Sequence, residues 1–575
     1  MFFTYITSRW NRRTALAAVL LLALFAFYPS LENGFTNWDD GNYLLENPLV
    51  RSLAPANVAH IFTRLHSGLY KPLVIFSFAV EYHFFGYNPL VYHVVNLAFH
   101  LANCALVFFI VERLSVGFGV AFITALLFGI HPMHVESVAW VSERKDMLYS
   151  FFFLLSFWLY LRYRASGSKK GYWCAVCAFV LSLISKPFGV ALPLLLLLTD
   201  WLQNRPRDRG FWLDKLPFFA LAGALGGLAF FTVKSAGVLF DRTALCLLDK
   251  FQILSYSFLF YSAKALFPVG LSVVYPYPVR DASGAYPFEY AFAPLLLMVV
   301  LSAAFYLLRK NRVSLYGLLF FIVTLIPGLQ WLPAAPSVAM DHYSYIPYIG
   351  FFMALSAPTL GWLENRSLAL RRWGVLLFMV VLVGLVAQAR ARCAVWKDSC
   401  VLWSDMLEKY RKPVAYVNRA VCLIERGEYG AALSDIEKAL ALNPEHYLAY
   451  ANRALVRYAL GEKEKGLADL RRVVELAPEQ WKMRYRLGAY LLEQGDTAGA
   501  RRELLEAARL APEEYSPHLL LGNIYLAQEC PFKAVEEFET AVRLSAPPEL
   551  GVSENVARLS AALRADGVTP GVCAE

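Results

Sequence analysis

Long apolar runs follow one another through the first two thirds of the chain and end near residue 391. A helix needs about 20 apolar residues to cross the ~30 Å hydrocarbon core of a bilayer, and its backbone must be satisfied internally there. The runs therefore predict an all-α, polytopic helical bundle of about eleven spans over residues 1–391. We place the spans at 14–31, 88–112, 117–131, 147–164, 171–184, 187–203, 215–234, 289–308, 313–331, 345–361 and 372–390.

The composition excludes an ordinary soluble protein for most of the length. Hydrophobic residues make up 58% of the chain and charged residues 17%, whereas soluble domains average about 25% charged. The net charge of +9 is spread in basic clusters that flank apolar runs, the pattern of topology-setting charge, so nucleic-acid binding is not indicated. All these clusters lie on the cytoplasmic side of the membrane if the ambiguous run 251–267 does not cross the bilayer. The amino terminus is then inside and the carboxyl-terminal region outside.

With this orientation, the loops that carry unusual polar residues all fall on the outer side, which predicts a single site there. Ionisable residues close to hydrocarbon are costly and mark functional sites, although a solvated loop with two capping aspartates also explains the acid pair Asp39-Asp40. The segments are Asp39-Asp40, in the outer loop 32–87; Tyr70-Lys71-Pro72; His131 to Glu136; Arg144-Lys145-Asp146; Lys186-Pro187; and Asp341-His342-Tyr343.

A repeat of 34 residues occupies the carboxyl-terminal part. Pro444, Pro478 and Pro512 keep this spacing, as do Gly427, Gly461 and Gly495. The period, with small residues in the first helix and proline after the second, is the tetratricopeptide signature. We expect an α-solenoid of four repeats, with a connecting segment before it and a carboxyl-terminal tail after it. The repeats lie at 413–446, 447–480, 481–514 and 515–548, the connecting segment at 392–412 and the tail at 549–575.

The repeats are candidates for binding a protein. Such stacks present a concave surface that binds extended peptides. Asn418 and Asn452 occupy matched positions in a shared Ala-Tyr-x-Asn-Arg-Ala pattern and could hold a peptide backbone. Polar residues that solvate a helix face explain the same pattern equally well.

The order of motifs resembles the transmembrane and tetratricopeptide repeat-containing (TMTC) family, in a bacterial-type form. These membrane proteins have the GT-C glycosyltransferase architecture and are related to protein O-mannosyltransferases. The resemblance runs from Phe35 through the repeats. It rests on Phe-Thr-Asn-Trp-Asp-Asp at 35–40, Tyr-Lys-Pro-Leu at 70–73, Tyr-His-Val-Val-Asn-Leu-Ala-Phe-His at 92–100, His-Pro-Met-His-Val-Glu-Ser-Val-Ala at 131–139, and Asp-His-Tyr at 341–343.

The resemblance implies an inverting transfer of sugar from a polyprenyl phosphate, with the repeats binding a protein acceptor. A carboxylate must take the acceptor proton, and we assign this to Asp39 or Asp40, favouring Asp39 by analogy with the mannosyltransferases. The leaving phosphate needs positive charge and hydrogen bonds. We assign these to Lys71, Arg144, Lys186, His131, His134 and His342, and expect Glu136, Asp146, Asp341 and Tyr343 to line the site.

Two positions depart from the family pattern. Lys71 and His342 stand where relatives commonly carry arginine. An arginine fork grips a phosphate in two places, whereas a histidine is a weaker, pH-dependent substitute. We therefore do not infer the identity of the acceptor, or that of the sugar, from the family.

No cofactor is required by this reading, but a divalent metal is an alternative. His131, His134 and Glu136 have ligand-like spacing, although Pro132 interrupts the helical register that would place both histidines on one face.

Two other functions compete with the transferase. A non-catalytic scaffold would use the bundle as an anchor while the repeats recruit envelope-assembly partners. A transporter of lipid-linked glycan would need ionisable groups deep within its spans, and few are visible. For the leading hypothesis we expect a bacterial inner-membrane protein with its repeats in the periplasm.

Overall fold

The computed structural model describes residues 11–65, 70–114, 116–235, 245–329, 337–544 and the single positions 554, 556, 557 and 561. Over these residues the structure is helical, with one isolated bridge between Pro276 and Ser337. The chain divides into two compact units, Met1–Tyr410 and Arg411–Glu575. The predicted tail 549–575 lies almost wholly outside the described residues.

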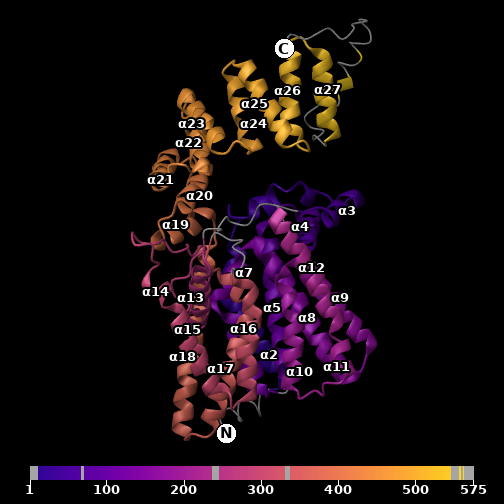
Figure 1. The fold of residues 1–575 in the computed structure, drawn as a ribbon, viewed down its shortest axis with the longest axis vertical. Coiled ribbons are helices and arrows are strands. Elements are labelled where there is room, and N and C mark those ends of the chain that lie inside the picture. Colours follow the sequence, from indigo (N-terminus) through magenta and orange to yellow (C-terminus); the bar gives the residue numbers. More distant parts are fainter. Residues whose placement is uncertain are drawn as a thin grey trace. The chain divides into compact units, whose positions relative to one another are not determined.

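The first unit is a bundle of long helices with short helical turns between them (Figure 1). Its first half comprises α2 (Arg12–Phe27), η1 (Tyr28–Glu32), η2 (Gly41–Leu45), η3 (Pro48–Arg51), α3 (Pro55–Thr63), α4 (Pro72–Phe85), α5 (Pro89–Arg113), α6 (Phe118–Ile130), η4 (Pro132–His134), α7 (Val135–Ala139), η5 (Val141–Glu143), α8 (Arg144–Ser166), α9 (Lys169–Ser185), η6 (Pro187–Ala191) and α10 (Leu192–Leu202). Its second half comprises α11 (Arg209–Leu213), α12 (Leu216–Ser235), α13 (Leu247–Leu266), α14 (Phe288–Ala291), α15 (Ala293–Leu308), α16 (Arg312–Leu325), η7 (Ile326–Gly328), η8 (Asp341–Ser344), α17 (Pro347–Glu364), α18 (Leu368–Val395) and α19 (Ser399–Lys409).

Every predicted span overlaps helix among the described residues, but the number of crossings stays a prediction. Four helical segments are long and apolar enough to cross a membrane: Arg12–Glu32, Pro89–Arg113, Arg209–Lys234 and Leu368–Val395. A fifth would be the bent pair Phe118–Ile130 and Pro132–Ala139, which turns by 55° at its break. Four further apolar segments are shorter than a full crossing: Pro72–Phe85, Pro187–Leu202, Ala293–Leu308 and Arg312–Gly328.

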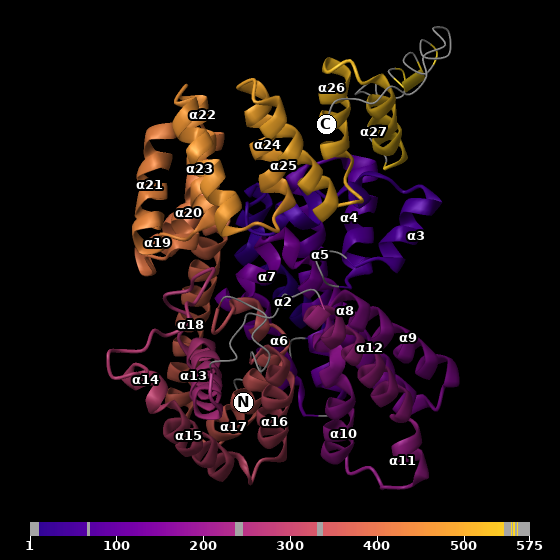
Figure 2. The same cartoon turned by 45° about the horizontal axis from the view of Figure 1, so that its top comes forward.

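The polar motifs and the basic clusters lie at opposite ends of the bundle. At one end, the first residue of α8, Arg144, donates to the carbonyl of Tyr92 near the start of α5. At the far ends of these helices, Arg12 pairs with Glu112 at 2.6 Å and Arg164 lies 4.0 Å from Asp200. Figures 1 and 2 show α3 and α4 at the opposite end of this unit from α11. The basic clusters and the polar motifs are thus separated along the helices.

The second unit is a stack of four helix pairs (Figure 2). They are α20 (Pro413–Glu425) with α21 (Tyr429–Leu442), α22 (Tyr447–Ala459) with α23 (Lys463–Leu476), α24 (Trp481–Glu493) with α25 (Thr497–Leu510), and α26 (Tyr515–Ala527) with α27 (Pro531–Arg543). The four predicted repeats each contain one pair. The segment 392–412, predicted as a connection, contains the end of α18 and all of α19 and falls almost entirely in the first unit.

Small residues explain why the helices of a pair approach so closely. A Cβ on Gly488 would lie 2.8 Å from the Leu504 side chain, and one on Gly522 would lie 2.5 Å from Phe538. Positive φ angles of 75°, 81° and 83° at Gly427, Gly461 and Gly495 make the turn between the two helices, a conformation that glycine adopts without steric cost. The fold class predicted from the sequence is confirmed.

Candidate functional site

The two aspartates of the acid pair have different surroundings. Asp40 is buried and its carboxylate accepts four hydrogen bonds. The Thr36 amide and hydroxyl donate at 2.8 and 3.1 Å, and the Ser142 amide and hydroxyl donate at 3.0 and 2.5 Å. Burial raises the pKa of Asp40, while these hydrogen bonds oppose the rise. Asp40 therefore ties the loop of residues 36–40 to the turn before α8.

Asp39 remains available for chemistry. Its side chain is 34% exposed, and its Oδ2 lies 3.4 Å from the Lys145 ammonium. The adjacent Asp40 is anchored, so the backbone that carries Asp39 is fixed while its carboxylate reaches solvent. This geometry favours Asp39 over Asp40 as a proton acceptor.

Lys145 connects the acid pair to a buried ion network. Its ammonium lies 2.8 Å from Glu143 Oε1, and 5.0 and 5.3 Å from the ring centroids of Trp140 and Tyr43. Burial opposes the charge, but Glu143 and Asp39 raise the pKa of Lys145 well above its ordinary value. Lys145 is therefore a fixed positive charge beside Asp39.

Lys186 belongs to the same network. It pairs with Asp146 and lies 3.7 Å from Glu143 Oε2. Its ammonium also faces the rings of Phe188 at 4.7 Å and Tyr343 at 5.3 Å. The predicted site residues Lys186, Asp146 and Tyr343 thus come together, with Glu143 between Lys186 and Lys145.

Lys71 is buried without a carboxylate partner among the described residues. Its ammonium donates to the Tyr43 hydroxyl at 3.1 Å and lies 5.0 Å from the centre of that ring. Burial lowers the pKa of Lys71, and the charges of Lys145 and Lys186 contribute to the lowering. A buried ammonium with no counter-charge is unstable by itself. An anion would relieve this cost.

Arg144, which we expected to bind phosphate, has a structural position instead. Its guanidinium pairs with Glu81 through two nitrogens, and it donates to Asn96 Oδ1 at 2.5 Å, to the Tyr92 carbonyl at 2.9 Å and to Ser77 Oγ at 3.4 Å. A guanidinium has five N–H donors, and all are engaged. Arg144 joins α4, α5 and α8 and leaves no donor for a ligand.

The two histidines of the His131–Glu136 motif are also engaged by the protein. His131 Nε2 lies 3.3 Å from the Ala265 carbonyl, and His131 Nδ1 accepts from the Met133 amide at 3.3 Å. His134 Nδ1 donates to the Phe128 carbonyl at 2.8 Å. Both rings pack against Tyr348. Both ring nitrogens of His131 are thus used by backbone groups, whereas Nε2 of His134 is buried without a hydrogen-bond partner among the described residues.

The late motif meets the others through Glu136. The His342 amide donates to Glu136 Oε2 at 3.2 Å, and His342 Nδ1 lies 3.2 Å from Glu136 Oε1. On its other side, His342 Nε2 lies 3.8 Å from Glu143. Burial lowers the pKa of His342, with Glu143 opposing the change. A neutral imidazole therefore stands between two carboxylates at this position of the late motif.

Asp341 makes its side-chain hydrogen bond outside this network. Its Oδ1 accepts from the Tyr275 hydroxyl at 2.7 Å. Burial raises the pKa of Asp341 to about 6, against the opposing charge of Arg392. Through this hydrogen bond Asp341 holds the start of η8 in place. This structural role is more direct than a role in lining the site.

The structure gathers a different set of potential metal ligands from the set that spacing indicated. Glu143, Asp146 and His342 are buried and their ligand atoms lie within 4.8 Å of one another. His131, His134 and Glu136 do not form such a group among the described residues. Lys145 and Lys186 already pair with the two carboxylates. These ammonium charges would repel a divalent cation, so the cluster is an ion network.

The two repeat asparagines differ in their contacts. Asn418 Nδ2 donates to the Val414 carbonyl within its own helix at 2.9 Å. Asn452 makes no hydrogen bond to any other described residue and stays half-buried on α22. The neighbouring arginines are structural, since Arg419 pairs with Asp435 at 2.7 Å and Arg453 with Asp469 at 2.7 Å.

Reasoning from the sequence missed the residues that organise the network. Glu143 and Lys145 flank Arg144 in the motif but received no role, and Tyr43 and Ser142 were not singled out. A cluster of acidic and basic residues directly before a membrane-length helix is a usable signal for such a network. Charged groups are rarely tolerated near lipid unless they have partners.

Fold and site together define a class: an integral membrane helical bundle with a buried charge network at one end, followed by a tetratricopeptide solenoid. Tetratricopeptide-repeat family models match residues 413–446, 452–515 and 485–549. The motifs' resemblance to the TMTC family is confirmed by the chain's relatives. The chain is 23% identical over 419 residues to the protein O-mannosyl-transferase F38B6.6 of Caenorhabditis elegans. This match covers 69% of this chain and 58% of that protein.

Shorter stretches match human relatives. The human protein O-mannosyl-transferase TMTC1 is 35% identical to this chain, in a match that covers 25% of this chain and 17% of TMTC1. Human TMTC4 is 29% identical, in a match that covers 29% of this chain and 27% of TMTC4. The chain thus matches less than two thirds of each relative. Among solved structures, Pseudomonas aeruginosa PilF is 27% identical over 26% of this chain and 69% of its own, with a TM-score of 0.25. YrrB is 21% identical over 28% and 81%, with a TM-score of 0.24, and neither likeness carries weight for function.

Proposed function

We propose that this protein is an inverting glycosyltransferase that uses a polyprenyl-phosphate sugar and glycosylates exported protein on the outer membrane face. The observation that carries the proposal is the partly exposed carboxylate of Asp39, held beside Lys145. The Lys145 ammonium in turn faces the same Tyr43 ring as the buried ammonium of Lys71. The names of the relatives, protein O-mannosyl-transferases, support the same class of activity.

In the proposed reaction, the acceptor hydroxyl attacks the anomeric carbon of the donor while Asp39 takes its proton. The bond from that carbon to the phosphate oxygen breaks, and polyprenyl phosphate departs with both electrons. Attack from the face opposite the phosphate inverts the anomeric configuration. General-base assistance of this kind contributes about 10²- to 10⁴-fold.

The lysines supply the charge that the leaving phosphate needs. Lys71 has no carboxylate partner among the described residues, so its charge is the least neutralised of the three. Lys145 and Lys186 are paired with Glu143 and Asp146 and contribute less. We therefore place the phosphate next to Lys71, with His342 and Tyr343 at the border of its site.

Transfer from a defined donor tests the proposal. Membranes containing the protein are given radiolabelled sugar on polyprenyl phosphate or on a nucleotide, and label in protein is counted. We expect protein labelling from the lipid donor, and a Lys71→Gln variant should lose donor affinity while keeping its thermal stability. Labelling from the nucleotide donor after the lipid carriers are extracted would contradict the lipid-dependent class.

A further inference from the structure

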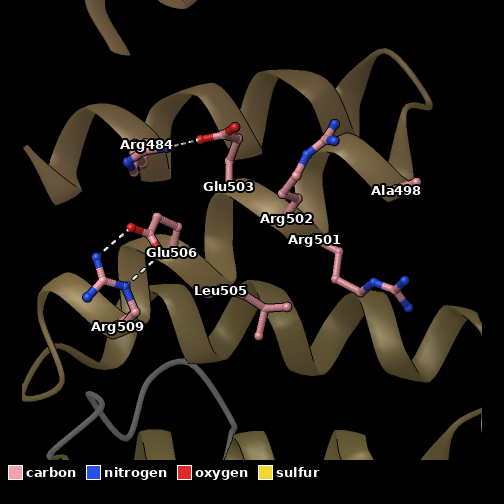
Figure 3. A pocket seen from close by; sticks show the side chains of 8 residues that line it. All are labelled: Arg484, Ala498, Arg501, Arg502, Glu503, Leu505, Glu506 and Arg509. Atoms are coloured by element: carbon pink, nitrogen blue, oxygen red, sulfur yellow. Dashed lines mark hydrogen bonds and ion pairs between the residues drawn. The ribbon is translucent and has the colours of Figure 1, made fainter. Parts of the chain in front are cut away.

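We propose that the second helix of the third repeat carries a separate docking site for an acidic peptide segment. The site is a cavity of about 730 Å³, shown in Figure 3. Its lining comes from α24 and α25: Arg484, Ala498, Arg501, Arg502, Glu503, Leu505, Glu506 and Arg509. The inference does not depend on the transferase reaction, and it concerns a different helix from those bearing Asn418 and Asn452.

The other repeats show that one of these arginines is unexpected. Arg501 stands 34 residues after Leu467 and 68 after Leu433, and 34 before Val535. Leu433 and Leu467 are partly buried and pack against the cores of their repeats. The position is thus built for an aliphatic side chain. A charge there forgoes packing, which is the kind of local inconsistency expected at functional sites.

The next position follows the same trend. Arg502 corresponds to Ser434, Ala468 and Glu536 in the other repeats. The third repeat is therefore the one in which both adjacent positions are basic. This difference cannot come from the requirements of the solenoid, because the other three repeats meet those requirements with other residues.

The charges around the cavity are only partly neutralised. Arg484 pairs with Glu503 at 2.8 Å, and Arg509 pairs with Glu506 at 2.7 Å. Arg501 and Arg502 make neither ion pair nor hydrogen bond within the described chain, and Figure 3 shows them directed away from the two ion pairs. The lining thus holds four guanidinium groups but two carboxylates.

The chemistry of the lining selects the partner. Clustered arginines bind carboxylates in two-pronged, charge-assisted hydrogen bonds. The cavity is much larger than a phosphate ion, and the 44% exposed Leu505 together with Ala498 offers an apolar contact. An extended segment with glutamate or aspartate beside an aliphatic residue meets both features. A protein partner or acceptor with such a segment would be held by the third repeat.

Binding of a fluorescent peptide of alternating glutamate and leucine to the full chain in detergent tests the site. The variants Arg501→Leu and Arg502→Ser carry residues already used by other repeats, so they are expected to fold. Arg471→Leu, on α23 and outside the cavity lining, is the control of equal charge change. We expect each pocket variant to weaken binding about tenfold, as for loss of one charge-assisted contact, and the control to bind like wild type.

Three results would overturn the proposal. The first is equal binding by wild type and the pocket variants. The second is an equal loss in Arg471→Leu, which would indicate a diffuse basic surface. The third is displacement of the peptide by inorganic phosphate or phosphatidylserine vesicles at concentrations below those of a competing acidic peptide. Sugar transfer by the pocket variants to a small soluble acceptor would be unaffected, which separates this site from the reaction centre.

Discussion

At the scale of single residues, neighbours in the sequence have opposite roles. Asp39 and Asp40 are adjacent, yet one carboxylate is half-exposed beside Lys145 while the other is saturated by Thr36 and Ser142. The same division separates Lys71, whose charge is unpaired by carboxylate in the described chain, from Arg144, whose donors are all used. Solvent access and hydrogen-bond saturation, rather than residue type, distinguish chemistry from architecture here.

The pKa of Lys71 predicts how donor binding depends on pH. Burial lowers this pKa, so the ammonium loses its proton, and with it the attraction for phosphate, at a lower pH than a free lysine would. We expect KM for the lipid donor to rise as pH increases through the lowered value. Lys71→Arg should remove this alkaline rise, because a guanidinium stays charged. Initial rates over a pH series for both proteins measure it, and identical profiles would exclude Lys71 from the donor site.

Arg144 is predicted to matter for folding. Replacing it with leucine leaves Glu81 as a buried, unpaired carboxylate, and losing one partner of a buried ion pair costs about 3–5 kcal/mol. We expect Arg144→Leu to lower the thermal transition strongly, and Glu81→Gln in addition to recover part of the loss. A stable Arg144→Leu protein with weakened donor affinity would return Arg144 to the phosphate site.

At the scale of elements, helices and repeats follow directly from periodicity, whereas contacts between loops do not. Apolar runs and the 34-residue period are local patterns, and each matches helix in the structure. The pairing of Asp40 with Ser142 joins residues 102 positions apart, and no local pattern encodes it. The same holds for His342 beside Glu136, and for Glu143, whose partners come from three segments. The motifs predicted which loops meet but not which side chains pair.

The fourth repeat offers a test of the turn chemistry. Glu529 has φ of 58°, 34 residues after Gly495 with φ of 83°. A residue with a Cβ costs about 1–2 kcal/mol of folded-state free energy in this region of backbone conformation. Replacing it with glycine removes that cost, but part of the gain is offset because glycine makes the unfolded chain more flexible. We expect Glu529→Gly to stabilise the repeats by about 1 kcal/mol in chemical denaturation of the full chain. Gly495→Ala should be destabilising, and the reverse signs would mean that this turn is not strained.

At the scale of the whole molecule, the orientation inferred from charge makes a prediction independent of chemistry. Eleven crossings put the loop of Asp39 and the carboxyl-terminal repeats outside and the cluster near Arg309 inside. In a bacterial host, alkaline phosphatase fused after the last residue should therefore be active, and the same reporter fused after Arg309 inactive. Activity in the reverse pattern would contradict the orientation, and activity at both points would contradict the crossing count.

We propose that Asp39 takes the acceptor proton while Asp40 holds the loop. Sugar transfer and thermal stability, measured together for Asp39→Asn and Asp40→Asn at matched expression, distinguish these two roles. We predict that Asp39→Asn keeps the wild-type transition and loses at least about 10²-fold in transfer. Asp40→Asn should be destabilised by about 1–3 kcal/mol, since an amide presents a donor to groups that themselves donate. Full transfer by a stable Asp39→Asn protein would contradict the account.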